Sequence, residues 1–365
     1  MKTNLNIKPL NDWGLPKSDR PLIIAGPCSA ESEKQVLETA IKLREKDIFI
    51  YRAGIWKPRT RPGHFEGVGS KGLAWLKKVK EETGMLVCTE VASEKHVYEA
   101  LKYGVDMIWI GARSTANPFV VQDIANALDG VDLPVLVKNP VNPDLELWKG
   151  AIERIHAAGI NKIAAIHRGF STFGKTNYRN LPTWQIPIDL KTEIADLPMI
   201  NDPSHIGGKR EFIHEIAQKA MDLNFDGLII ESHLNPSCAL SDAQQQITPD
   251  ELDAILHALV MRKPNGQSKE TMQELITYRK QIDDFDKALM AVIEERMEVV
   301  KKIGKFKKDN QMTILQSSRW EQIIEKHLTD GSNRGFSEKF INRLFKAIHQ
   351  ESINFQTKIM NEQAG

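Results

Sequence analysis

Residues 22–54 read LIIAGPCSAESEKQVLETAIKLREKDIFIYRAG, and they contain the unit that much of the chain repeats. LIIAGP (22–27) is a short apolar run that ends at Gly and Pro. SEKQVLETAIKLREK (32–46) spaces its apolar residues as an amphipathic helix does, and IFIYRAG (48–54) is a second apolar run. This order predicts a strand, a loop, a helix and a further strand.

The same unit recurs up to about residue 260. Further apolar runs of strand length lie at 85–91, 107–112, 134–140, 162–169, 197–205 and 227–233. Eight such runs in roughly 240 residues predict a parallel sheet that is buried on both faces, and a closed (β/α)8 TIM barrel is the first expectation. A doubly wound sheet is the alternative, but the first strand is not followed by a glycine fingerprint for a dinucleotide.

A polar segment, RKPNGQSKE (262–270), breaks the pattern, because it contains Pro and Gly and shows no periodicity. We therefore expect a barrel domain over residues 1–262, a linker over 263–270 and a second domain over 271–365.

The second domain is predicted to be all-α, with three helices. Residues 271–308 contain no Pro and carry apolar side chains in heptads, which predicts one helix of about 35 residues. Shorter helices are expected near 316–329 and from Ser337 to about 361. Because a lone long helix with an apolar stripe must pack on something, we expect a homodimer through this domain.

The composition is that of a globular protein, since 41% of the 365 residues are hydrophobic and 27% are charged. The net charge of +1 lacks the positive excess that nucleic acid or an anionic membrane would favour, so we expect neither as a partner. There is no apolar segment of a signal peptide at the N-terminus and no run long enough to span a bilayer. Three widely separated cysteines, Cys28, Cys88 and Cys238, favour a reducing compartment and thus the cytoplasm.

Polar residues gather where the predicted barrel strands end, at the face on which parallel barrels place their active sites. One set is cationic: Arg52, Lys57, Arg59, Arg113, Lys138 and Arg168. Cations that converge on one cavity repel one another and are costly to desolvate without anions. Because Arg binds phosphate and carboxylate through bidentate bonds, the set predicts a site for more than one phosphate, with a carboxylate as well.

A second set offers a thiol, an imidazole and two carboxylates: Cys28, His205, Glu231 and Asp242. These groups suit a divalent transition metal such as Mn²⁺, Fe²⁺, Co²⁺ or Zn²⁺. Their spacing in the sequence gives no support, since only the barrel geometry brings them together. Taken alone, Cys28 is more often a small buried hydrophobe than a ligand. A metal beside several anions suggests polarisation of a carbonyl while a phosphorylated partner attacks it.

Several short motifs resemble those of the short, type Iβ 3-deoxy-D-arabino-heptulosonate 7-phosphate (DAHP) synthases. They are GPCSAES (26–32), KPRT (57–60), GAR (111–113), VLVKNP (135–140), HRG (167–169), DPSH (202–205), ES (231–232) and ALSDAQQ (239–245). The resemblance covers about residues 20–260 and implies a barrel that condenses phosphoenolpyruvate with erythrose 4-phosphate at the start of the shikimate pathway. The related synthases of an eight-carbon sugar acid resemble KANRS where this chain has KPRT, so KPRT favours the four-carbon aldose.

The resemblance implies roles for the residues at the strand ends. Cys28, His205, Glu231 and Asp242 are expected to hold the metal. Arg113, Lys138 and Arg168 are expected to bind phosphoenolpyruvate, with Arg52 and Lys57 nearby, while Arg59 and Thr60 hold erythrose 4-phosphate. The proton donor to the nascent alkoxide is expected to be Lys138, or a water held by the metal, and Glu90 is a candidate for managing the water that adds to phosphoenolpyruvate.

Polar residues interrupt the apolar stripes of the predicted helical domain. Arg296 takes a heptad position otherwise filled by apolar side chains, and Ser352 and Gln356 interrupt the stripe of the third helix. They indicate either scattered surface polarity or a buried site for an anion.

Residues 271–360 resemble the all-helical chorismate mutases, whose ligand positions fall on Arg279, Arg296, Lys307, Arg319, Ser352 and Gln356. The resemblance implies that Arg296, with Arg279 from a partner chain, clamps the carboxylates of chorismate, and that Lys307 and Gln356 face the breaking ether oxygen. Two positions depart from that family. Trp320 stands where an acidic residue usually contacts the substrate hydroxyl, and Gln316 stands where Asp is frequent.

Together these features predict a bifunctional enzyme, a metal-dependent DAHP synthase joined to a chorismate mutase, with feedback inhibition by prephenate. The competing interpretation makes the helical domain a regulatory and dimerisation module of weak catalytic activity. A third possibility is a sugar-acid synthase that needs no metal.

Overall fold

The computed structural model describes residues 5–16, 20–57, 63–174, 176–194, 196–263 and 268–361. The chain divides into two compact units, Met1–Pro264 and Asn265–Gly365, and each is described by itself.

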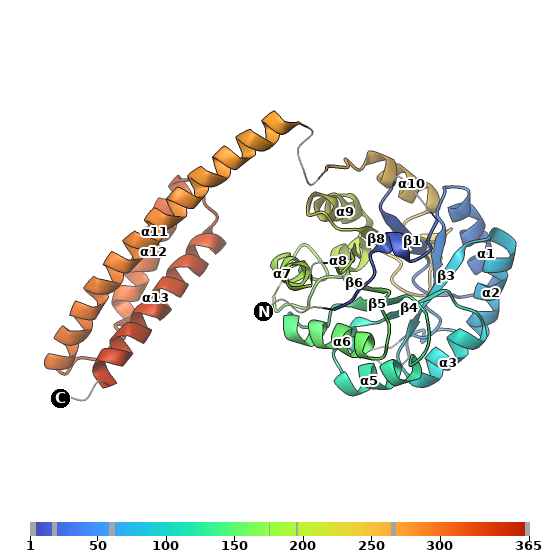
Figure 1. The fold of residues 1–365 in the computed structure, drawn as a ribbon, viewed down its shortest axis with the longest axis horizontal. Coiled ribbons are helices and arrows are strands. Elements are labelled where there is room, and N and C mark those ends of the chain that lie inside the picture. The colour runs from blue at the N-terminus through green and yellow to red at the C-terminus, as the bar shows by residue number, and fades with distance from the viewer. Residues whose placement is uncertain are drawn as a thin grey trace. The chain divides into compact units, whose positions relative to one another are not determined.

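The first unit is a closed barrel of eight parallel strands in the order β1-β2-β3-β4-β5-β6-β7-β8, which confirms the predicted fold (Figure 1). The strands are β1 Leu22–Gly26, β2 Ile50–Arg52, β3 Leu86–Val91, β4 Met107–Ile110, β5 Val135–Lys138, β6 Ile163–His167, β7 Met199–Asn201 and β8 Gly227–Glu231. The barrel closes where β1 pairs with β8, from Leu22 opposite Gly227 to Gly26 opposite Glu231. The first and last strands of the sequence are therefore neighbours.

Helices surround the barrel, and the loops between strands and helices carry short helical turns (Figure 1). The longer helices are α1 Glu33–Arg44, α2 Lys71–Thr83, α3 Glu94–Lys102, α5 Pro118–Ala127, α6 Leu145–Ala157, α7 Gln185–Glu193, α9 Ile213–Asp222 and α10 Pro249–Ala258. The short ones are η1 Leu10–Asp12, α4 Ala112–Thr115, α8 Pro203–Gly207, η2 Arg210–Phe212 and η3 Pro236–Cys238. Ser32 begins α1 by accepting a hydrogen bond from the Gln35 amide, and Thr248 and Glu251 form a capping box that begins α10.

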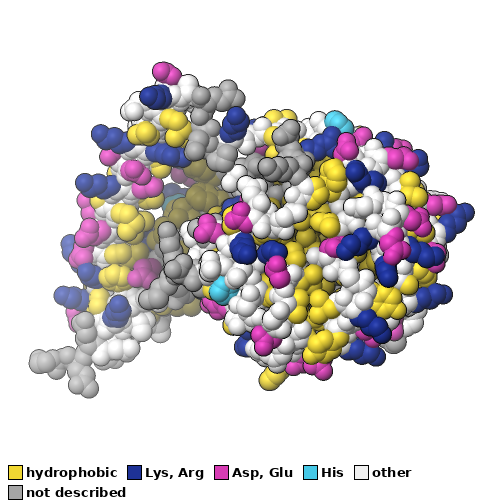
Figure 2. Space-filling model, turned by 45° about the vertical axis from the view of Figure 1, so that its right-hand side comes forward, with side chains coloured by type: hydrophobic (Ala, Val, Ile, Leu, Met, Phe, Trp, Pro, Cys, Tyr) yellow, Lys and Arg dark blue, Asp and Glu magenta, His cyan; other side chains and the backbone are white. Residues whose placement is uncertain are grey.

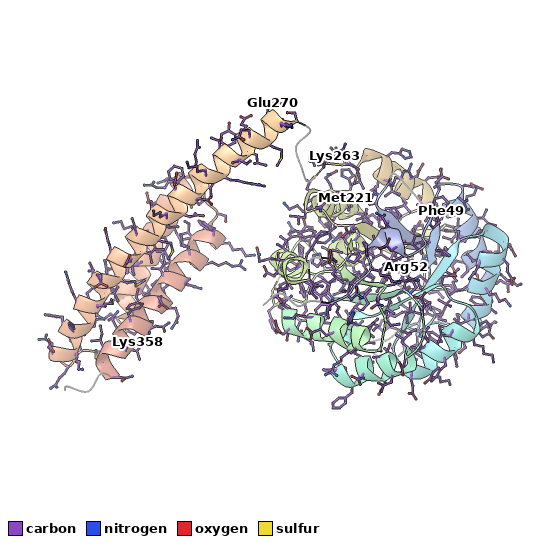
Figure 3. All side chains as sticks on the ribbon, viewed as in Figure 1. Phe49, Arg52, Met221, Lys263, Glu270 and Lys358 are labelled. Atoms are coloured by element: carbon purple, nitrogen blue, oxygen red, sulfur yellow. The ribbon has the colours of Figure 1, made fainter. Side chains whose placement is uncertain are left out.

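Side chains alternate between two cores along each strand. Ile24 and Ile50 point into the barrel, while Ala25 and Tyr51 lie in the core between the strands and the helices. At the carboxyl end of β2 the inward position is Arg52, which lies within the ring of helices (Figure 3). The strand pattern thus delivers charged side chains to one end of an apolar barrel.

The second unit consists of three helices, as predicted: α11 Lys269–Asp309, α12 Ser317–Asn333 and α13 Glu338–Asn361. Ser268 caps α11, so this helix of 41 residues begins two residues before its predicted start. The buried residues of α11 are Met297, Val300, Gly304 and Lys307, all in its C-terminal half. Hydrophobic side chains are visible on the surface of the unit among charged ones (Figure 2).

Of the helices among the described residues, none combines the length and apolar character needed to cross a bilayer.

Candidate active sites

Three of the four predicted metal ligands come together at the closure of the barrel. Cys28 follows β1, Glu231 ends β8, and Asp242 lies in the loop that follows β8. Their ligand atoms all lie within 4.8 Å of one another. His205, on α8, is not a member of this group, but its Nε2 lies 3.7 Å from Glu231 Oε1.

Asp202 holds both His205 and Lys138. Its Oδ2 lies 2.8 Å from His205 Nδ1 and accepts a hydrogen bond of 2.8 Å from Lys138 Nζ. Because Nδ1 faces Asp202, the imidazole directs Nε2 toward Glu231. Burial alone would raise the pKa of Asp202, but His205 and Lys138 outweigh it and hold that pKa well below its ordinary value.

Two of the predicted substrate-binding cations are paired with buried carboxylates of the chain. Arg52 Nη1 lies 3.3 Å from Glu231 Oε1, and Lys138 is bound to Asp202. The Arg52 guanidinium and the Lys138 ammonium also lie over the ring of Trp109, at 4.8 and 5.9 Å from its centroid. Their charge is therefore partly compensated without a ligand.

Lys57, in the loop after β2, and Glu90, on β3, lie close enough to interact electrostatically. Lys57 Nζ donates to the carbonyl oxygen of Cys28 at 3.1 Å and to its Sγ at 3.2 Å. Glu90 Oε2 accepts a hydrogen bond of 3.2 Å from Trp109 Nε1. A Cβ at Gly111 would lie 2.1 Å from Glu90 Oε1, so this carboxylate needs a glycine beside it.

The remaining predicted cations differ in burial. The Arg168 amide donates a hydrogen bond to Asn139 Oδ1 at 2.7 Å, and its Nη1 donates to Asn180 Oδ1 at 2.8 Å. Burial lowers the pKa of Arg168 to about 10. Arg113 lies on α4 and is exposed. Arg59 and Thr60, expected to bind erythrose 4-phosphate, lie outside the described residues.

The acid–base state of the three-residue cluster depends on its burial and its neighbours. Burial and then Glu231 raise the pKa of the Cys28 thiol to about 12. For Asp242, burial is outweighed by Arg179 and His205, so its pKa falls below the ordinary value. In the structure the thiol donates a hydrogen bond of 3.4 Å to Asp242 Oδ2.

Sequence reasoning missed several residues that support these ligands. Asp202 lies in the motif DPSH, whose only assigned member was His205. Arg179 Nη1 bonds to Asp242 Oδ1 at 2.9 Å, and Gln245 Nε2 donates to Glu231 Oε2 at 2.7 Å. Arg179 lies in a long loop after β6 without a strand-end signal. Gln245 could have been noticed from its place in ALSDAQQ.

The donor set fits a divalent transition metal. Sulfur, imidazole nitrogen and carboxylate oxygen are the ligand types that such ions take in proteins. Three of the four donors also have a second partner that fixes their orientation, as metal ligands commonly do: Asp202 for His205, Arg52 for Glu231 and Arg179 for Asp242.

In the helical unit, four of the six predicted ligand positions lie on α11 and α13, which pack against each other. Arg296 Nη1 donates to Ser352 Oγ at 2.7 Å. Gln356 Nε2 donates to the Ser352 carbonyl at 3.3 Å, and Lys307, Ser352 and Gln356 are buried. Burial lowers the pKa of Lys307. A cation and two polar side chains inside a helical core, with Arg296 at their edge, suit an anionic ligand.

The other two predicted positions are exposed. Arg319 bonds to Gln322 on α12. Arg279 lies 17 residues before Arg296 on α11, which corresponds to about 25 Å along the helix axis. One chain therefore cannot place both guanidinium groups on one small dicarboxylate.

Comparison with known proteins matches both units. The model of the family described as "DAHP synthetase I family" matches residues 10–267, and that of "Chorismate mutase type II" matches residues 278–357. A phospho-2-dehydro-3-deoxyheptonate aldolase of Thermotoga maritima is 36% identical over 225 residues, which cover 62% of this chain and 64% of the relative. This chain thus spans less than two thirds of that protein.

Other relatives are similar in the barrel region. A 2-dehydro-3-deoxyphosphooctonate aldolase of Legionella pneumophila is 32% identical over 262 residues, covering 66% of this chain and 91% of the relative. The crystal structure of the Thermotoga maritima DAHP synthase has a TM-score of 0.59 at 34% identity, covering 64% of this chain and 67% of that one.

Proposed function

Since the chain belongs to the DAHP synthetase I family and carries a chorismate mutase type II domain at its C-terminal end, we propose that it is a bifunctional enzyme of the shikimate pathway. The barrel condenses phosphoenolpyruvate with erythrose 4-phosphate to DAHP, with the help of a divalent metal. The helical domain rearranges chorismate to prephenate.

One observation carries the barrel proposal: a thiol and two carboxylates within 4.8 Å of one another, beside Arg52, Lys57 and Lys138. A divalent ion held by Cys28, Glu231 and Asp242, with His205, supplies a Lewis acid for the aldehyde. The cations supply the countercharge for phosphoenolpyruvate, which carries a phosphate and a carboxylate.

The chain's own residues position the reactants and move the protons. Arg113 and Arg168 bind phosphoenolpyruvate, and Arg59 and Thr60 bind the aldose phosphate. A bond forms between C3 of phosphoenolpyruvate and the aldehyde carbon, whose oxygen takes a proton from Lys138 Nζ. Glu90 guides the water that adds at C2, and phosphate then leaves. The bond from Lys138 to Asp202 supports its role, because it fixes the position of Nζ.

The choice of the four-carbon aldose is part of this proposal, since relatives of both product classes are similar to the barrel. It is supported by KPRT at residues 57–60. The test is chelation followed by re-addition of Mn²⁺, Fe²⁺, Co²⁺ or Zn²⁺, with erythrose 4-phosphate and a five-carbon aldose phosphate in parallel. Activity that survives chelation would support the metal-independent alternative, and a preference for the longer aldose would overturn the substrate assignment.

For the helical domain we propose a homodimer with shared active sites. The apolar stripe of α11, which includes Phe285 and Leu289, is exposed in a single chain. A second copy that covers it would bring the partner's Arg279 toward Arg296, Lys307 and Gln356. This arrangement supplies the second guanidinium for the carboxylates, while Lys307 and Gln356 stabilise charge on the ether oxygen.

Feedback inhibition of the synthase by prephenate follows naturally from a prephenate site on the same chain. The alternative, a regulatory and dimerisation module of weak catalytic activity, is supported by Trp320 and Gln316, which replace acidic residues of the mutase pattern. A mutase assay on residues 265–365 and on the whole chain separates the two, because binding of prephenate without turnover favours the module. Synthase activity that prephenate leaves unchanged would refute the feedback.

We also propose a cytoplasmic location, which the three free cysteines support.

A further inference from the structure

One buried side chain joins the two loops that carry Cys28 and Asp242. Gln246 Oε1 accepts a hydrogen bond of 2.9 Å from the Cys28 amide. Its Nε2 donates to the Ser241 carbonyl at 2.7 Å. Gln246 is completely buried, so neither bond competes with water and the loss of either would leave a buried polar group unsatisfied.

The link crosses the seam where the barrel closes. Cys28 and Gln246 are 218 residues apart in the sequence and meet because β1 pairs with β8. Two further contacts tie the same loops: Ser29 Oγ lies 2.5 Å from Ser241 Oγ, and the Leu240 amide donates to Glu31 Oε1 at 2.7 Å. Gln246 differs from these contacts in what it binds. On one loop it binds the backbone of Cys28, a predicted ligand, and on the other it binds the backbone of Ser241, the residue before the ligand Asp242.

The backbone at Asp242 explains why such a link is needed. Asp242 has a φ of 48°, in the left-handed region that is uncommon for residues other than Gly, although Asp and Asn adopt it more often than most. The Ser241 carbonyl belongs to the rigid peptide plane that precedes Asp242. A hydrogen bond to that oxygen therefore fixes the orientation of this peptide plane. The φ angle of Asp242 is then restricted, and with it the direction of the carboxylate.

The neighbouring glutamine provides a contrast. Gln245 bonds to the side chains of Glu231 and Arg179, so its removal would change the electrostatics of the ligands directly. The bonds from Gln246 described above reach only backbone atoms. A change at Gln246 can therefore alter the site only through geometry.

We propose that Gln246 is a positioning residue that sets the distance and direction between the Cys28 thiol and the Asp242 carboxylate, and so the affinity of the site for a divalent metal. The inference rests on the proposed metal-dependent function. Because supporting partners of metal ligands commonly contribute a factor of about 10–100 in affinity, the loss of Gln246 is expected to weaken metal binding by that factor.

The test is a titration of the metal-free, full-length enzyme with Co²⁺, followed by calorimetry and by the thiolate-to-cobalt charge-transfer absorption. Gln246→Met keeps the length of the side chain and removes both hydrogen bonds. Gln244→Met is the matched control, since Gln244 is exposed on the same loop. We expect Q246M to bind Co²⁺ about 10–100-fold more weakly with a reduced thiolate band, and Q244M to match the wild type.

The outcomes separate the inference from the proposed function. Wild-type affinity and an unchanged band in Q246M would overturn the positioning role alone. The proposed metal centre itself would be overturned if the wild-type enzyme bound Co²⁺ but showed no thiolate-to-cobalt band, or showed a band that Cys28→Ser does not remove. If Q246M loses its folded circular dichroism, Gln246→Asn, which keeps the amide and shortens its reach, is judged by the same two measurements.

Discussion

The barrel buries its apolar strand residues within one chain, whereas the helical unit leaves a long apolar stripe uncovered. Ile24, Ile50 and Trp109 are fully buried or nearly so inside the barrel. On α11, Phe285 and Leu289 are 71% and 53% exposed. The difference teaches that the barrel completes its core within one chain, while the helical unit presents an apolar surface of the kind that marks an interaction site.

The two candidate sites differ in the same way. The barrel provides the partners of its own cations, since Glu231 pairs with Arg52 and Asp202 with Lys138. In the helical unit, Arg279 lies about 25 Å along α11 from Arg296. The first site is therefore expected to depend on single buried residues, and the second on association.

The largest effect is expected for Lys138→Met, which sharpens the view of the barrel site as self-contained. Without the ammonium the new alkoxide lacks its proton donor, so DAHP turnover should fall by about 10²–10⁴-fold. The measurement is kcat for DAHP formation beside kcat for the mutase reaction on the same sample, and only the first should change.

Lys102→Met provides the control, because Lys102 is an exposed lysine at the end of α3. Turnover of Lys138→Met near that of the wild type would remove Lys138 from the chemistry. An equal loss in both reactions would point instead to a general folding defect.

The next effect concerns the stripe of α11. In the double variant Phe285→Lys, Leu289→Lys, two charges replace side chains that a second copy would bury. Dimer dissociation should become easier by about 10³-fold, or roughly 4 kcal/mol. Mutase activity should fall with the dimer, whereas DAHP formation in the absence of prephenate should stay. Sedimentation velocity over a range of concentrations measures the association.

Thr277→Lys adds one positive charge on another face of α11 and should leave the dimer intact. A double variant that stays dimeric with full mutase activity would break the comparison, since the stripe would then serve another purpose.

The sequence predicted the barrel because each strand carries its own local signal of apolar, β-branched residues. It also predicted which residues lie at the strand ends, since in a parallel barrel these ends share one face. The three-helix unit was equally predictable from its heptads and from Ser337, whose Oγ accepts a hydrogen bond from the Phe340 amide.

Arg179, Gln246 and Asp202 could not be predicted as supporting residues, for physical reasons. Arg179 reaches Asp242 from an irregular loop, where neither periodicity nor strand position determines the direction of a side chain. The link between Gln246 and Cys28 depends on a closure of the barrel that spans 218 residues of sequence. Asp202 ends the strand signal of β7, but only the folded chain brings it to both Lys138 and His205.

The folding stability of the barrel should depend on pH in a way that the helical unit does not share. His167 is fully buried, and burial lowers its pKa from 6.5 to about 4. Between these values the unfolded chain binds a proton that the folded barrel does not, so stability falls as the pH drops from about 6.5 to about 4. The loss from this group is on the order of 3 kcal/mol.

His167→Gln should flatten this slope for the barrel, as measured by urea unfolding at several pH values. The unfolding of the helical unit, followed separately by hydrogen exchange of the amides of α11, α12 and α13, should keep its wild-type dependence on pH. A barrel slope that is the same in the variant and the wild type would assign the acid sensitivity to other groups.

The smallest effect concerns an aromatic pair of the helical unit. Trp320 stacks on His349 with ring centroids 4.0 Å apart. Burial, Arg296 and Lys307 together lower the pKa of His349. Trp320→Ala should destabilise this unit by about 0.5–1.5 kcal/mol and, because it uncovers the imidazole, move the pKa of His349 up toward its ordinary value.

Phe345→Ala is the control, because it removes the parallel stack on His327 and should shift the pKa of that histidine alone. Both values are readable by NMR titration of the histidine rings. If His349 does not respond to the loss of Trp320, the cations of the candidate mutase site, rather than the stack, set its protonation, and the pair contributes packing only.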